Sequence, residues 1–182
     1  MKSRILLLLT VCLAGHQIAH AQTLDPAMQA GVDAKIRLIA TWAADPVIVD
    51  AVKARNTAVP AGELALNKDK WRALTVLDPL VRSFTKNPVG QFLKGKKDES
   101  VTEAFVSDAA GLKVGFLAKT SNWTHKGSPK HDVPMTGKSW QGPVEIDESS
   151  GQRQLQLAVP VLDAGRPIGS LVVGFSVSKL GQ

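Results

Sequence analysis

Cysteine is almost absent from this sequence: the 182 residues contain one, Cys12, and no tyrosine at all. A lone cysteine excludes a disulfide framework and a metal site built from cysteines. The apolar share of 44% excludes a disordered or low-complexity chain. The length suits one domain with enough chain to bury a core.

Long apolar runs are also missing. The apolar stretch at residues 5–14 is far shorter than the roughly 20 residues that span a bilayer. It follows two basic residues and precedes Ala19-His20-Ala21, which places small residues where signal peptidase cleaves. We therefore interpret residues 1–21 as a secretory signal peptide that is cleaved after Ala21. The alternatives are an uncleaved anchor and a lipoprotein signal at Cys12.

Cleavage at this point removes the cysteine and two basic residues and lowers the net charge from +6 to +4. The mature chain is expected to be periplasmic or secreted, without a membrane-spanning segment. The basic residues are dispersed, and the run Lys94-Gly95-Lys96-Lys97 is followed at once by two acidic residues, which predicts a solvated loop. Nucleic acid is therefore not expected as a partner.

The first half of the mature chain has helical periodicity. Apolar residues recur at spacings of three and four from Met28 to Ala43, which predicts one buried stripe. Asp45-Pro46 and Asp78-Pro79 are both typical helix starts, because Asp caps the first turn and Pro fits its first position. A further helix is expected over 67–77, and Asn87-Pro88-Val89-Gly90 is interpreted as a loop. The helix that begins at Asp45 is expected to bury Val47, Ile48, Ala51 and Val52.

From residue 101 the apolar period changes to two, which is typical of β-strands. The expected strands are 101–108, 112–118, 144–147, 155–161 and 171–177. Short turns join all but one pair, so the sheet should be antiparallel. The order predicts an α+β fold of one domain, in which the N-terminal helical region 22–100 covers a five-stranded antiparallel sheet formed by residues 101–182.

One connection, residues 119–143, is too long for a simple turn, and loops of this length are often functional. It contains His125, His131, Trp123 and Trp140, together with four lysines and one acidic residue. Aromatic faces with cationic and amide donors suit a small anionic or amino-acid-like ligand. A second interpretation stays open, in which the loop is a mobile surface segment whose tryptophans pack into the core.

Gln154 and Gln156 share one face of an expected strand. Alternation predicts that this face meets water, because Leu155 and Leu157 occupy the other. The alternative is that the two amides point into a site beneath the long loop.

Catalytic patterns are weak. The spacing of His125, His131 and Asp132 matches no helical face, so no metal is expected. Serines lie near the histidines, but the sequence has no Gly-x-Ser-x-Gly elbow, no paired carboxylates and no phosphate loop. We therefore expect no catalytic residues, no cofactor and no enzymatic activity. A hydrolase is the least favoured alternative.

Three segments resemble the extracytoplasmic sensor domains called Cache, or PDC, domains, which have a PAS-like fold. They are the hairpin Phe105-Val-Ser-Asp-Ala-Ala-Gly-Leu-Lys-Val, the stretch Thr120-Ser-Asn-Trp123, and the closing hairpin from Gln156 to Gly174 with its proline, Asp-x-Gly turn and Ile-Gly. The resemblance implies a PAS-like sheet with a small-molecule site between it and the loop. Carried over by position, Asn122 and Trp123 stand where related loops often have Asp and Tyr, and Lys130 matches a later basic residue.

The resemblance thus predicts a soluble periplasmic module that binds a small carboxylate or amino-acid-like ligand and acts in signal transduction or chemotaxis. Because the chain ends soon after the last expected strand, we expect a free-standing exported form that signals through a membrane receptor or kinase. Trp123→Ala is expected to weaken binding with little loss of fold. A ligand-independent module that docks on a membrane receptor is the alternative. The residues expected to bind the ligand are Asn122, Trp123, His125, Lys126, Lys130, Trp140, Asp147 and Gln156.

Overall fold

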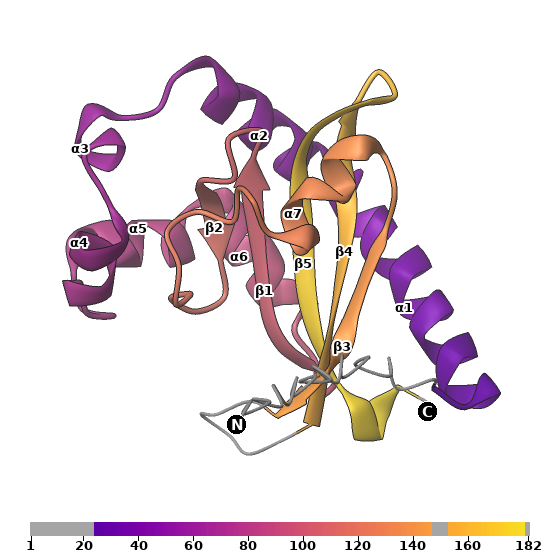
Figure 1. Ribbon diagram of the computed structural model, residues 1–182. Coiled ribbons are helices and arrows are strands. Elements are labelled where there is room, and N and C mark those ends of the chain that lie inside the picture. The colour runs from indigo at the N-terminus through magenta and orange to yellow at the C-terminus, as the bar shows by residue number, and fades with distance from the viewer. Residues whose placement is uncertain (1–23, 147–152, 181–182) are drawn as a thin grey trace, which may run out of the picture.

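The computed structural model describes residues 24–146 and 153–180. The expected signal peptide, Asp147 and the connection between the expected strands 144–147 and 155–161 lie wholly or partly outside these residues. The described chain is built around a five-stranded sheet (Figure 1). None of the described helices is both long and apolar enough to cross a membrane.

Five antiparallel strands run in the order β2-β1-β5-β4-β3 across the sheet. They are β1 (Val101–Asp108), β2 (Lys113–Phe116), β3 (Trp140–Ile146), β4 (Arg153–Asp163) and β5 (Arg166–Ser176), which is followed by the 3-10 turn η2 (Val177–Lys179). The expected α+β class, with helices first and an antiparallel sheet after them, is confirmed. The third strand begins earlier than expected, because Trp140 and Gln141 already pair with β4.

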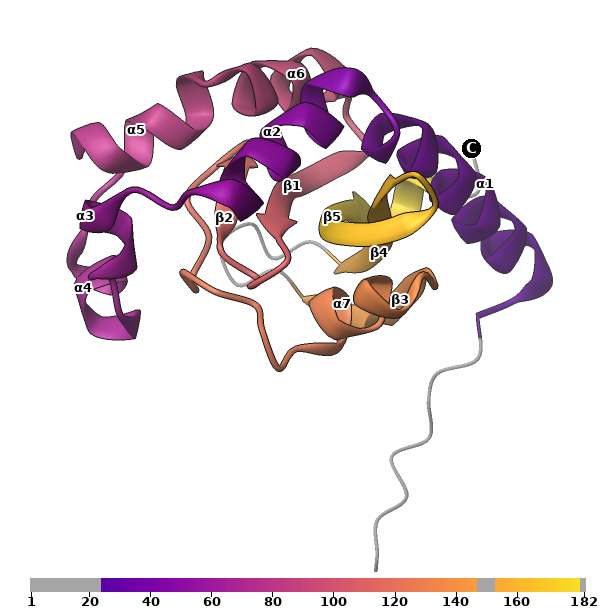
Figure 2. The same cartoon turned by 90° about the horizontal axis from the view of Figure 1, so that it is seen from above.

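Two helices, α1 (Pro26–Ala43) and α2 (Pro46–Thr57), cover one face of the sheet (Figure 2). Each begins at an Asp-Pro pair, as expected for Asp45-Pro46. The carboxylate of Asp25 accepts a hydrogen bond from the N–H of Met28, and that of Asp45 accepts one from Val47, both at 2.9 Å. The caps mark where α1 and α2 each begin, whereas the apolar periodicity alone does not show that there are two helices.

The buried side of α2 differs from the expectation at one residue. Ile48 and Val52 are fully buried, but Val47 is 38% exposed, so its expected burial is wrong. Successive residues of an α-helix are turned by about 100°, whereas residues four apart share a face. Val47 therefore lies beside the stripe that Ile48 and Val52 form.

Four shorter helices continue the chain. They are α3 (Ala61–Leu64), α4 (Lys68–Ala73), α5 (Pro79–Lys86) and α6 (Pro88–Lys96). The helix expected over 67–77 ends at Ala73, while Asp78-Pro79 begins α5 as expected. The basic run at 94–97 is exposed as expected, but its first three residues form the last turn of α6 and no loop.

The prediction of a loop at 87–90 is wrong, because Asn87 caps α6. Its Oδ1 accepts a hydrogen bond from the N–H of Gly90 at 2.8 Å, and its Nδ2 donates to the carbonyl oxygen of Val114 in β2 at 2.7 Å. The pair Asn-Pro is a signal for turns and for helix starts alike. The contact with β2, which is distant in sequence, decides between the two.

Alternation along the strands separates the chemistry of the two sheet faces. Toward α1 and α2 the sheet directs apolar side chains, including Leu155, Leu157, Val159, Leu171, Val173 and Phe175. The other face carries polar groups, including Lys113, Gln156 and Ser170. That face is also covered, because the short helix α7 (Pro129–Asp132) and the 3-10 turn η1 (Pro134–Thr136) lie over it (Figure 2). The polar part of this face is therefore enclosed between the sheet and residues 119–143, beside the buried apolar residues Phe105, Phe116, Ala158 and Val172.

The packing of α6 on α5 predicts opposite effects for two glycines of α6. A Cβ added at Gly90 stands 2.4 Å from the carbonyl oxygen of Phe84 and 2.6 Å from that of Thr85. Gly90→Ala should lower the free energy of unfolding by about 1–3 kcal/mol, because backbone atoms must move. Gly95→Ala is the matched control: nothing lies within 4 Å of its added Cβ, so helix propensity should raise stability by up to about 1 kcal/mol. Urea denaturation measures both, and equal effects would contradict this packing.

Candidate functional site

Two buried side chains hold the loop 119–143 against the rest of the protein. Trp123 is 4% exposed, and its ring centroid lies 5.1 Å from that of Trp71 in α4 and 5.6 Å from that of Phe84 in α5. His131 of α7 is 2% exposed, and its Nδ1 lies 2.8 Å from the Oγ of Ser170 in β5. The loop is therefore tied to the helical layer at one point and to the sheet at another.

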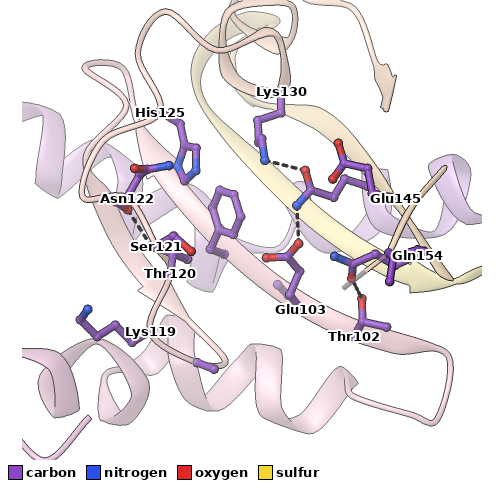
Figure 3. Close-up of a pocket in the computed structure, with 15 residues that line it drawn as sticks. Thr102, Glu103, Lys119, Thr120, Ser121, Asn122, His125, Lys130, Glu145 and Gln154 are labelled. Carbon is purple, nitrogen blue, oxygen red and sulfur yellow. Dashed lines mark hydrogen bonds between the residues drawn. The ribbon is translucent and has the colours of Figure 1, made fainter. Parts of the chain in front are cut away.

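Between this loop and the sheet lies a cavity of about 560 Å³ (Figure 3). Its floor is formed by β1 and β4, through residues 102–105, Gln154 and Gln156. Its walls are formed by the loop and β3, through residues 118–122, His125, Lys130, Glu145 and Ile146. Three segments that are distant in sequence thus meet around one space.

The expected binding residues divide between this cavity and other places. Those that line it are Asn122, His125, Lys130 and Gln156. Those that do not are Trp123, which is buried in the aromatic cluster, Lys126, which is exposed, and Trp140, which is half-buried. Asp147 lies outside the described residues. The ring of Trp123 is part of the core, which argues against the expectation that Trp123→Ala leaves the fold almost intact.

Three further residues of the cavity, Thr102, Glu103 and Glu145, are not identified by the sequence analysis. Glu103 could have been found from the alternation along β1, because Glu103 and Phe105 must lie on the same face of the sheet. The side chains of Gln154 and Gln156 lie in the cavity and not in open water, which agrees with the second interpretation of that strand face.

A chain of hydrogen bonds crosses the cavity floor (Figure 3). The Nζ of Lys130 donates to the Oε1 of Gln156 at 2.5 Å, and the amide of Gln156 donates to the carboxylate of Glu103. Beside it, the Oγ1 of Thr102 donates to the Oε1 of Gln154 at 2.7 Å. These bonds orient the amides and the carboxylate before any ligand arrives.

A histidine with a strongly altered pKa lies at the other end of the cavity. The ring of His125 stacks on that of Phe105, with centroids 4.6 Å apart and planes at 15°. Its Nδ1 contacts the Nζ of Lys113, a fully buried residue of β2. Burial first, and then the charges of Lys113 and Lys130, lower the pKa of His125 to about 2. The imidazole is therefore neutral at physiological pH.

A metal site and a serine–histidine pair are the two catalytic arrangements considered in the sequence analysis. Among residues 24–146 and 153–180, no three His, Cys, Asp or Glu side chains are arranged to hold a metal ion. Ser170 and His131 form a serine–histidine pair, but both are buried and neither lines the cavity. This pair therefore fastens α7 to β5.

Comparisons with known proteins give structural matches alone. No protein family matches the sequence, and no curated protein is similar to it. The fold is similar to the sensor domain of the Vibrio cholerae histidine kinase DctB, with 15% identity and a TM-score of 0.49 over 85% of this chain and 55% of that one. It is also similar to the ligand-binding domain of the Pseudomonas aeruginosa amino acid chemoreceptor PctC, solved with GABA, with 12% identity and a TM-score of 0.48 over 84% and 56% of the two chains.

A further similar structure is the ligand-binding domain of the Campylobacter jejuni chemoreceptor Tlp3, with 13% identity and a TM-score of 0.42 over 88% of this chain and 63% of that one. The chain thus spans between 55% and 63% of the length of these three structures. All three are named as sensor or ligand-binding domains, and at these identities and TM-scores the likeness concerns the fold alone.

The burial of Trp123 predicts a large loss of stability when it is truncated. Trp123→Ala should lower the free energy of unfolding by about 3–5 kcal/mol, because it leaves a cavity among aromatic rings. Asn122→Ala is the neighbouring control, since that side chain is exposed, and should change stability by less than about 0.5 kcal/mol. Chemical denaturation compares the two. A small loss at Trp123 would show that the loop is not anchored there.

The low pKa of His125 predicts a defined loss of stability in acid. An unfolded histidine has a pKa of about 6.5, so below this pH the unfolded chain binds a proton that folded His125, with its pKa of about 2, does not. The contribution of neutral His125 to the free energy of unfolding is therefore complete above about pH 6.5 and is lost as the pH falls below it. The free energy of unfolding of the native protein, relative to that of His125→Gln, should therefore fall by up to about 1.4 kcal/mol per pH unit below about pH 6.

Urea denaturation of both proteins at several pH values measures this relative slope. A difference that stays constant across the range would mean that His125 titrates normally in the folded protein.

Proposed function

We propose that this protein is a small-molecule-binding sensory module whose ligand occupies the cavity beneath the loop 119–143. The observation that carries the proposal is a sheet face that is covered but not filled. Its cavity of about 560 Å³ falls within the range of about 300–1,000 Å³ typical of small-molecule sites. On the opposite face, where packing is the only task, apolar side chains close the space.

The proposed ligand is a small carboxylate or amino-acid-like molecule. The two ends of the cavity differ in charge (Figure 3). Lys119, Asn122 and His125 offer hydrogen-bond donors at one end, and Glu103 and Glu145 offer carboxylates toward the other, where Lys130 is bound to Gln156 (Figure 3). A molecule with an acidic group and an amino group complements both ends.

The module is proposed to act outside the cytoplasm and to pass its signal to a membrane receptor or kinase. The signal peptide expected at residues 1–21 supports export. A hydrolase has less support, because the serine–histidine pair of Ser170 and His131 is buried and does not line the cavity. Docking on a receptor without any small ligand is the competing function, and it predicts that no compound stabilises the fold.

A thermal-shift screen with a library of small metabolites tests the proposal. A ligand at 100 times its Kd stabilises the native state by about 2.7 kcal/mol, which should raise the Tm by roughly 5–10 °C for a domain of this size. We expect amino acids or carboxylates among the compounds that raise the Tm.

Two cavity variants locate the binding site. Asn122→Ala and Glu145→Gln alter exposed groups at opposite ends of the cavity and should reduce the shift caused by the same compound. Gln91→Ala alters an exposed amide on α6, outside the cavity, and should leave the shift unchanged. A screen without any stabilising compound would favour docking without a ligand. A shift that all three variants retain would place the ligand elsewhere.

A further inference from the structure

Lys113 is buried in a way that is unusual for a lysine. Its relative exposure is 0%, and lysines are rarely so buried unless an acidic group pairs with them. Among the described residues no carboxylate forms a salt bridge or hydrogen bond with it. Its Nζ instead contacts the Nδ1 of His125 and lies 3.8 Å from the centroid of the Phe105 ring. An ammonium above an aromatic face is attracted by that ring.

Lys113 lies directly behind the cavity wall. Phe105 and His125 line the cavity and stack on one another, whereas Lys113 does not line it. The Nζ of Lys113 contacts the edge of the His125 ring at Nδ1 and lies over the face of the Phe105 ring. His125 thus contacts both the buried amine and the cavity.

The contact with Lys113 determines which ring nitrogen of His125 carries the proton. A neutral imidazole has one N–H donor and one bare acceptor nitrogen. The protonated amine of Lys113 has N–H donors and no acceptor, so opposite it Nδ1 of His125 accepts and Nε2 carries the hydrogen. Within residues 24–146 and 153–180, no group forms a hydrogen bond with Nε2. This N–H is therefore available to a ligand.

We propose that Lys113 is a positioning residue that holds His125 as a neutral Nε2–H donor and lends positive charge to that end of the cavity, so that the site takes a negatively charged oxygen there. The inference rests on the proposed function, because it assigns the acidic group of the ligand to His125. It makes Lys113, which does not line the cavity, part of the recognition of the ligand's acidic group.

The surroundings of Lys113 make its charge sensitive to what binds beside it. Burial first, and then Lys130 of α7, lower the pKa of Lys113 well below its ordinary value, while Glu103 and Asp108 of β1 favour the charged form. The neighbouring His125, and His131 of α7, are themselves kept neutral mainly by burial. An anion beside His125 adds a negative charge near Lys113, so it binds more tightly where the amine is protonated.

Nitrogen-15 NMR of the histidine rings tests the first half of the proposal without any ligand. In the native protein, His125 should be the Nε2–H tautomer and should stay neutral down to about pH 5 and below. Lys113→Met removes the donor and its charge, and should give a mixture of tautomers and a higher pKa for His125. Lys119→Met removes a lysine that lines the cavity without touching His125, and should change neither. An Nδ1–H tautomer in the native protein overturns the proposal, and this result does not depend on how any variant folds.

Titration with sodium acetate, against sodium chloride at equal ionic strength, tests the second half. Acetate should shift the Nε2 and Hε2 signals of His125 in a saturable way, and Lys113→Met should weaken this binding by about tenfold or more. Acetate that leaves these signals unchanged, or that binds Lys113→Met equally well, overturns the assignment of the anion to His125. The tautomer result and the metabolite screen are independent, so failure of the proposed function and failure of this inference are distinguishable.

Discussion

Side chains alternate between the two faces of a β-sheet, and in this protein the two faces carry different kinds of side chain. Leu155 and Leu157 pack against the first two helices, while Gln154 and Gln156, between and beside them on β4, face the opposite way. The first face supplies the hydrophobic core that holds the domain together. The second face is mixed. Phe105, Phe116, Ala158 and Val172 belong to a second buried apolar cluster, and beside this cluster the loop 119–143 covers polar side chains while leaving a polar space. The cavity stays open because the loop 119–143 is held by contacts outside the cavity, those of Trp123 and His131.

Trp123 provides one of these ties and shows how a residue supports a site without lining it. Its ring packs with Trp71 and Phe84, so that α4, α5 and the loop form one aromatic cluster. Asn122 and His125 flank it in sequence and both line the cavity. Burial of the tryptophan therefore positions the polar residues on either side of it. Helices that lie outside the cavity thus contribute to its shape.

The buried charged side chains of the domain differ in how many hydrogen-bond and ion-pair partners they have. Asp108 accepts hydrogen bonds from the N–H groups of Ala110 and Leu112, both at 2.9 Å, and lies 3.7 Å from Arg55, which also pairs with Glu63. This group links α2, α3 and the turn after β1, and it has a clear structural task, although burial still raises the pKa of Asp108. Lys113 has no such carboxylate partner among the described residues. A buried amine of this kind costs stability, which is the physical reason to connect it with recognition.

Local patterns predicted much of the fold. Asp45-Pro46 and Asp78-Pro79 mark helix starts correctly, because the fixed φ angle of proline acts within one turn of the chain. Asp45 also caps its helix, whereas the carboxylate of Asp78 accepts from Thr75. The strands and the antiparallel order also follow from the period of two and the short turns. Asn87-Pro88 was misassigned to a loop, because its choice between turn and helix depends on a hydrogen bond to Val114 of β2.

The candidate site was only partly predictable for the same reason. His125 and Lys130 are identified because they belong to one polar, aromatic loop, and the composition of a loop is a local property. Asn122 is identified through the resemblance to Cache domains. The sequence by itself therefore determined the helix caps, the strand alternation and the position of the covering loop. Tertiary structure alone decided that Glu103 meets Gln156, that Trp123 turns into the core, and that Lys113 lies behind His125. These contacts join segments far apart in sequence, and they form only when the whole sheet and its cover pack together.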